Sequence, residues 1–104
     1  MRQVKPVQLS GTAQETLRRL DDGGVIDATE LDDGAFYVAI LHRAFRDSWT
    51  VPVNVLRGLV KRGLVARQYT SEWRETRWVT AYSTDTRKRR DTTFVLSDEG
   101  RKVL

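Results

Sequence analysis

Cysteine is absent from this sequence of 104 residues, and histidine occurs once, as His42. The lack of cysteine excludes disulfide scaffolds, cysteine-based zinc sites and thiol catalysis. A single histidine excludes metal sites built from several histidines. The sequence also has no glycine-rich phosphate loop and no nucleophile beside a base. We therefore expect a protein that is not an enzyme, with no catalytic residues, no metal site and no cofactor.

Long apolar runs are missing as well. No stretch approaches the roughly 18 apolar residues of a membrane span, and Met1–Pro6 lacks the apolar core of a signal peptide. Hydrophobic residues make up 39% and charged residues 31% of the chain, a mixture typical of globular proteins. At this length we expect one domain, residues 1–104, in a cytoplasmic protein without membrane contact.

Charge is unevenly distributed along the chain. Residues 1–42 carry a net charge of −3 (four basic, seven acidic) and residues 43–90 a net charge of +8 (twelve basic, four acidic). Residues 91–104 have a net charge of −1 (two basic, three acidic). A domain polarised in this way often turns its basic half toward a polyanion, although an arginine-rich solvated surface has the same composition.

The first predicted helix covers Ser10–Asp22. Thr12 and Glu15, three positions apart, match a capping box, and a pair of glycines ends the helix. The residues that follow are strongly acidic but lack the ligand spacing of an EF-hand. We expect a short strand at Val25–Ile26, then a loop or a single helical turn over Thr29–Asp33, with the carboxylates forming a solvated acidic face.

Two further helices are predicted, joined by a short turn. In Ala35–Arg46 (AFYVAILHRAFR) the apolar side chains would cover about 200° of the circumference, which is typical of a central, mostly buried helix. The next helix runs from about Val51 to Arg62, with Thr50 as its expected N-cap and Pro52 in its first turn. Its apolar and polar residues lie on opposite faces.

From Leu64 onward the apolar period changes to two, which indicates strands. Ser97 is the expected N-cap of a last short helix. The predicted strands are Leu64–Thr70, Arg77–Tyr82 and Thr92–Leu96, with loops at Ser71–Thr76 and Ser83–Arg90.

Two segments resemble a known family. Val55–Val65 (VLRGLVKRGLV) resembles the recognition helix and first wing strand of winged helix-turn-helix regulators, and Phe94–Arg101 (FVLSDEGR) is similar to the junction after the wing in the MarR and PadR groups. The resemblance covers about residues 12–104. It implies an α+β winged helix-turn-helix fold. Three core helices would be followed by a two- or three-stranded antiparallel wing and a short C-terminal helix.

On the second helix of a helix-turn-helix, the outward side chains reach base edges in the major groove. Here Asn54, Arg57 and Lys61 share the polar face, and asparagine and arginine can bond adenine and guanine. Gly58 on that face would let the backbone approach DNA closely. Ser48 and Thr50 are predicted phosphate contacts at the helix N-terminus, where simple capping is the alternative.

The wing is predicted to contact the DNA backbone or the minor groove. Clustered cations repel one another, so their clustering favours an anionic partner, although a solvated loop is the alternative. The predicted contacts are Arg74 and Arg77 in the first hairpin and Arg87, Lys88, Arg89 and Arg90 in the basic loop.

These observations predict sequence-specific binding of double-stranded DNA by a small transcriptional regulator of bacterial, archaeal or phage type. One alternative is a protein-interaction module that docks a basic partner on the acidic face Asp21–Asp33. Another is an RNA-binding winged helix in which the basic loop dominates. A homodimer stays open, as do the operator and any effector ligand.

Overall fold

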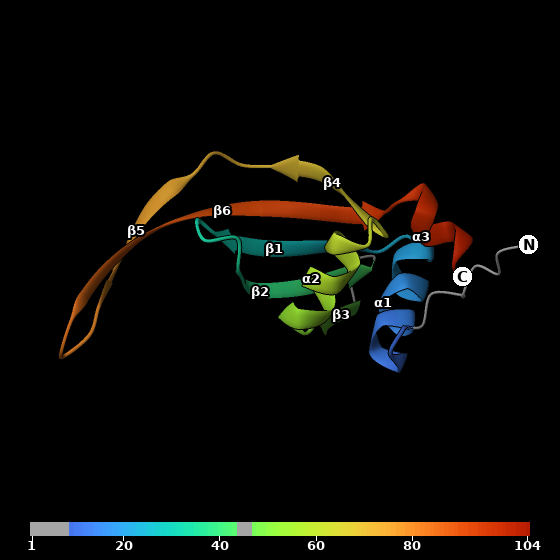
Figure 1. Cartoon of the computed structure of the whole chain (residues 1–104), viewed down its shortest axis with the longest axis horizontal. Coiled ribbons are helices and arrows are strands. Elements are labelled where there is room, and N and C mark those ends of the chain that lie inside the picture. The colour runs from blue at the N-terminus through green and yellow to red at the C-terminus, as the bar shows by residue number, and fades with distance from the viewer. Residues whose placement is uncertain (1–8, 44–46) are drawn as a thin grey trace, which may run out of the picture.

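One antiparallel sheet is the framework of the molecule (Figure 1). The computed structural model describes residues 9–43 and 47–104. Over these residues the chain forms, in order, α1 (Gly11–Asp21), β1 (Val25–Leu31), β2 (Phe36–Arg43), β3 (Asp47–Thr50), α2 (Val53–Lys61), β4 (Val65–Thr70), β5 (Arg74–Val79), β6 (Thr84–Leu96) and α3 (Asp98–Lys102).

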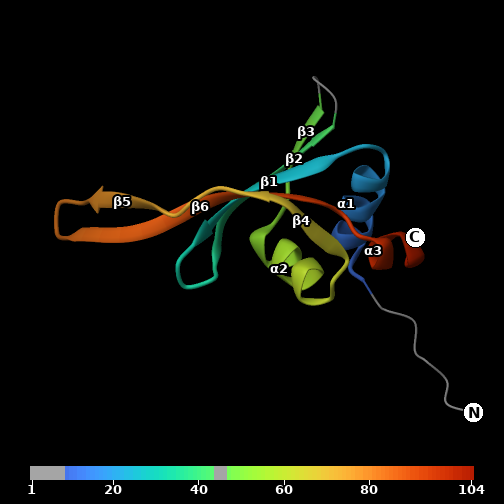
Figure 2. The ribbon, with the colours of Figure 1, turned by 90° about the horizontal axis from the view of Figure 1, so that it is seen from above.

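The strand order of the sheet is β3-β2-β1-β6-β4, and β5 also pairs with β6. Three strands therefore pair with β6, which makes it the central strand of the fold. Near its C-terminal end β6 pairs with both β1 and β4, and near its N-terminal end with β5 alone. Residues 74–89, from β5 through the first part of β6, form a two-stranded ribbon that we call the arm. Figures 1 and 2 show the arm extending from the end of the body opposite to α1 and α3.

The hydrophobic core lies between the sheet and the helices α1 and α2, which contact β2, β4 and β6. Phe94 of β6 is fully buried at its centre, and its ring meets that of Phe36 edge-on with centroids 5.8 Å apart. The helices contribute to this core the buried side chains Ala13, Leu17, Leu20, Leu56 and Leu59. None of the described helices covers the opposite face of the sheet, and Val38 and Ile40 on it are only half-buried.

The predicted central helix Ala35–Arg46 is wrong, because its described part forms the strand β2. Phe36, Ala39 and Leu41 point into the core, whereas Val38 and Ile40 lie on the other face. When both faces of a strand are apolar, its sequence is a continuous apolar run. Periodicity alone does not distinguish such a run from a buried helix. The last three residues of the prediction, 44–46, lie outside the described residues.

The winged helix-turn-helix fold class is therefore corrected to a six-stranded antiparallel sheet with three short helices, counted over the described residues. The helix α2 follows the strand β3 instead of a second helix, so no helix-turn-helix forms around it. Thr50 lies in β3, and Pro52 takes the N-cap position without a side-chain hydrogen bond. Locally, the predicted helix ending at Gly63 (φ 71°) is confirmed as α2.

The predicted hairpins also need correction. Ser83–Arg90 is not a loop, because all but its first residue lies in β6, and β5 starts at Arg74 instead of Arg77. Polar residues occupy both faces of the arm, which projects into solvent, so the alternation that identifies a half-buried strand is missing there. The predicted strands Leu64–Thr70 and Thr92–Leu96 are confirmed within β4 and β6.

Both terminal helices are confirmed. α1 is capped by Ser10, whose hydroxyl accepts a hydrogen bond from the Ala13 amide at 3.1 Å, so the predicted capping box of Thr12 and Glu15 is not the cap. α3 is capped as predicted by Ser97, whose hydroxyl accepts from the Gly100 amide at 3.0 Å.

Candidate nucleic-acid interface

Cations without an acidic partner mark two surfaces of the molecule. Among the described lysines and arginines, nine form ion pairs with carboxylates. Five form no ion pair in the described part of the chain, and these are Arg57 and Lys61 on α2 and Arg77, Lys88 and Arg89 on the arm. Within residues 9–43 and 47–104, these five cations lie on one helix and on one ribbon.

The register of the arm decides which of its side chains share a face. Arg77 lies directly opposite Thr86, and Lys88 lies directly opposite Glu75. Opposite residues of an antiparallel pair point to the same side, as do residues two apart in one strand. We call this side of the arm the Arg77 face. The other side, with Arg74 opposite Arg89 and Arg87 two positions further along, is the Arg89 face.

A hydrogen-bonded turn closes the tip of the arm. The amide of Thr80 donates to the carbonyl of Ser83 at 2.8 Å, and the amide of Ser83 donates back to the Thr80 hydroxyl at 3.0 Å. Tyr82 between them is 99% exposed. The tip is therefore a defined turn that presents an aromatic side chain to solvent.

A buried carboxylate anchors the base of the arm. Glu30 of β1 is only 6% exposed. Arg67 of β4 donates to it twice, from Nη1 to Oε2 at 2.8 Å and from Nη2 to Oε1 at 3.1 Å. Arg90 of β6 donates from Nε to Oε2 at 2.9 Å, and its guanidinium carbon lies 4.5 Å from the ring centroid of Trp73. Three strands and the connection into β5 are thereby joined at one point.

The electrostatics of this anchor keep Glu30 ionised. Burial by itself raises the pKa of the Glu30 carboxyl, but the hydrogen bonds and charges of Arg67 and Arg90 outweigh it and hold the pKa below its ordinary value. The sequence predicts Glu30 on a solvated acidic face, and the structure corrects this prediction to a buried anchor. Its signal would have been the alternation of Ile26, Ala28 and Glu30, which places the carboxylate on the core side of a strand.

The predicted contacts on α2 are exposed, as expected. Asn54, Arg57 and Lys61 all face solvent. Gly58 is half-buried, and a Cβ built on it would have no atom within 4 Å. Ser48 and Thr50 are exposed on the edge strand β3 instead of the helix N-terminus.

The predicted contacts on the arm divide by their partners. Arg74 pairs with Asp91, and Arg87 pairs with Asp85 at 3.0 Å and with Asp33 at 3.8 Å. The hydrogen bond and charge of Asp85 raise the pKa of the Arg87 guanidinium.

Two of the remaining predicted cations differ from these pairs. Arg90 belongs to the Glu30 anchor, whereas Arg89 has no ionic partner and its Nε is buried without a hydrogen-bond acceptor. Arg77 and Lys88 are the other free cations of the arm.

The acidic segment Asp21–Asp33 does not form one face. Asp22 pairs with Arg43 at 2.6 Å, and Asp27 lies 3.3 Å from His42 on the uncovered face of the sheet. Glu30 points to the core side. Because these carboxylates point in different directions and most have partners, the geometry does not favour a single docking surface for a basic protein.

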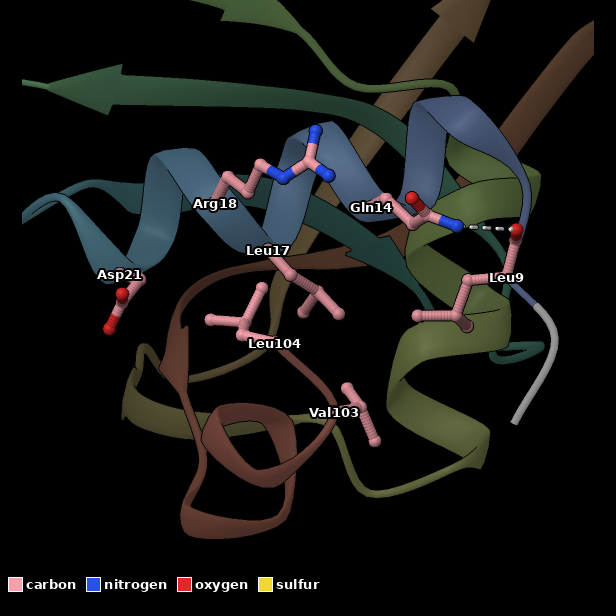
Figure 3. A pocket seen from close by; sticks show the side chains of 7 residues that line it. All are labelled: Leu9, Gln14, Leu17, Arg18, Asp21, Val103 and Leu104. Atoms are coloured by element: carbon pink, nitrogen blue, oxygen red, sulfur yellow. Dashed lines mark hydrogen bonds between the residues drawn. The ribbon is translucent and has the colours of Figure 1, made fainter. Parts of the chain in front are cut away.

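The surface of the molecule has several shallow hollows. One of about 310 Å³ lies between α1 and the last two residues, with Leu17, Val103 and Leu104 beside Arg18 and Asp21 (Figure 3). Its lining includes Gln14, whose amide donates to the Leu9 carbonyl at 3.2 Å. In the described residues no group of three His, Asp or Glu side chains could hold a metal.

The helices of the described chain are too short and too polar to cross a membrane. Comparison with known proteins gave no match to a family model, a curated protein or a solved structure. Function is therefore inferred from the geometry of the chain alone.

Proposed function

We propose that the protein binds double-stranded DNA and that the arm enters a groove of the duplex. The arm itself carries this proposal, as a two-stranded ribbon that extends beyond the body with Arg77 and Lys88 free of ion pairs on one face. The major groove of B-DNA is about 12 Å wide and admits a two-stranded ribbon. Free cations on the ribbon neutralise phosphates and release counterions, which drives association.

The helix α2 supplies a second contact surface in this proposal. Arg57 and Lys61 are exposed there without ion pairs, next to the exposed Asn54. Regulation of transcription by a small cytoplasmic protein would require base discrimination as well. Arg77 is suited to guanine and Asn54 to adenine, and each good bidentate pair discriminates by about 1–3 kcal/mol.

The test is binding of a random duplex, measured by fluorescence anisotropy over a salt series from 50 to 300 mM. The arm variant is Arg77→Glu/Lys88→Glu, and the helix variant Arg57→Glu/Lys61→Glu is its matched control, because both lower the net charge equally. We expect the logarithm of the wild-type affinity to fall with the logarithm of salt, with a slope of about −0.9 per phosphate contacted. The arm variant should lose binding, and the helix variant should bind more weakly than wild type but measurably.

Absence of wild-type binding at 50 mM salt would overturn the proposal. Equal loss in both variants would show that net charge, rather than the arm, governs binding. Binding of duplex RNA of the same sequence, measured in the same way, tests the RNA-binding alternative. The major groove of A-form RNA is too deep and narrow for a ribbon. We expect duplex RNA to bind more weakly than DNA.

A further inference from the structure

Three arginines gather on the Arg89 face at the base of the arm. Arg74 lies directly opposite Arg89, and Arg87 is two residues before Arg89 in the same strand. Like charges directly opposite one another destabilise an antiparallel pair. The chain therefore holds three guanidinium groups on one side of the ribbon at an electrostatic cost, where β1 ends with Leu31 paired to Arg89.

The carboxylates around these arginines leave one charge uncompensated. Asp91 takes one nitrogen of Arg74, while Asp85 accepts from Arg87 Nε and Asp33 lies 3.8 Å from Arg87 Nη1. Arg89 has neither an ion pair nor a side-chain hydrogen bond in the described structure. Arg74 and Arg87 each donate one side-chain hydrogen bond to a described residue, so their other donors have no acceptor in this part of the chain.

Among the three arginines, Arg89 lacks partners most clearly. Its Nε is buried, and it is the one buried side-chain nitrogen or oxygen without a hydrogen-bond partner among the described residues. Leaving a buried donor unpaired destabilises the folded state, and an acceptor from a ligand would remove this cost. Arg89 as a whole is half-buried, so part of its side chain still reaches solvent.

We infer that Arg74, Arg87 and Arg89 form a binding site for a phosphate group. A phosphate offers several acceptor oxygens and negative charge, and guanidinium groups bind it through paired, charge-assisted hydrogen bonds. When DNA is bound, the phosphate is a backbone phosphodiester next to the base of the arm, and this last step rests on the proposed function.

The first experiment measures the thermal midpoint of the full chain in inorganic phosphate and in sodium chloride at equal ionic strength. A ligand that binds only the folded state raises this midpoint. Arg89→Ala is compared with Lys88→Ala, which removes the same charge one residue away on the Arg77 face. We expect phosphate to raise the midpoint of wild type and Lys88→Ala but not of Arg89→Ala. Arg89→Lys keeps the positive charge but loses the planar guanidinium with its paired donors. This variant should retain only part of the rise in thermal midpoint with phosphate.

The second experiment measures the salt dependence of DNA binding for the same variants. Loss of one phosphate contact in Arg89→Ala should lower the magnitude of the slope by about one. The site is overturned if phosphate does not raise the thermal midpoint of wild type, or if Arg89→Ala and Lys88→Ala lose this rise equally. A rise that depends on Arg89 without DNA binding would keep the phosphate site and refute the proposed function. If phosphate has no effect and Arg89→Ala binds DNA as well as wild type does, the phosphate site is refuted and the proposed function is kept.

Discussion

The Arg67 guanidinium holds the Glu30 carboxylate through two parallel hydrogen bonds, of 2.8 and 3.1 Å, across a sheet in which the strand β6 separates their two strands. This fork explains how a charged residue is tolerated beside the core. Arg90 completes it from β6, the strand that continues into the arm. Stability of the body and orientation of the arm therefore depend on the same carboxylate.

Glu30→Gln should destabilise the protein by about 2–3 kcal/mol. The amide keeps the size of the side chain but leaves two partly buried guanidiniums without their counter-charge. Chemical denaturation measures this change in the free energy of unfolding. Glu15→Gln on the exposed face of α1, which loses an ion pair with Arg19, is the control and should change stability by less than about 0.5 kcal/mol. Similar losses in the two variants would contradict the role given to the anchor.

The stability difference between wild type and Glu30→Gln should depend on pH. The pKa of Glu30 is lower in the folded state than its ordinary value of 4.5, so its contribution is complete above that value. As the pH falls through the folded pKa, the carboxyl becomes protonated and the contribution is lost. Thermal midpoints should therefore differ most near pH 7 and converge below pH 4.5. A constant difference across this range would show that the carboxylate charge is not the stabilising feature.

Two glycines should respond to alanine in opposite ways. A Cβ on Gly58 meets no atom within 4 Å, so Gly58→Ala should stabilise α2 by about 1 kcal/mol through its better helix propensity. A Cβ on Gly100 would clash with the Leu64 carbonyl oxygen, so Gly100→Ala should destabilise the protein by about 2–3 kcal/mol. Urea denaturation separates the two outcomes. Because the arm is the main DNA contact and α2 the second, Gly58→Ala should change the DNA affinity far less than Arg77→Glu/Lys88→Glu does.

The helices on the core could be predicted from the sequence, because their local signals agree with their packing. Ala13, Leu17 and Leu20 follow the helical period, and all three are buried against the sheet. β2 could not be recognised from periodicity, since both of its faces are apolar. The dipeptide Asp33-Gly34 was the available signal, because Gly34 has a φ of 86° in the turn that joins β1 to β2.

The candidate site could be predicted in its residues but not in its geometry. The cations of residues 74–90 were visible in the charge pattern. Which of them are free depends on cross-strand register and on carboxylates far away in sequence. Glu30 meets Arg90 across 60 positions, and no local pattern encodes that pairing. The division of the arm into an Arg77 face and an Arg89 face likewise appears only once the turn at Thr80–Ser83 sets the register.

Removing the carboxylate of Glu75 should strengthen DNA binding. Glu75 lies directly opposite Lys88 on the Arg77 face, has no ion pair in the described structure, and would approach the phosphates of a bound duplex. Glu75→Gln should tighten binding about 3- to 5-fold at 50 mM salt, since one repulsive charge near a phosphate costs roughly 1 kcal/mol or less. Glu99→Gln on α3, at the opposite end of the molecule, changes the net charge identically and should have little effect. The gain should shrink toward 300 mM salt as screening increases. Equal affinities of the two variants would mean that the Arg77 face does not lie against the duplex.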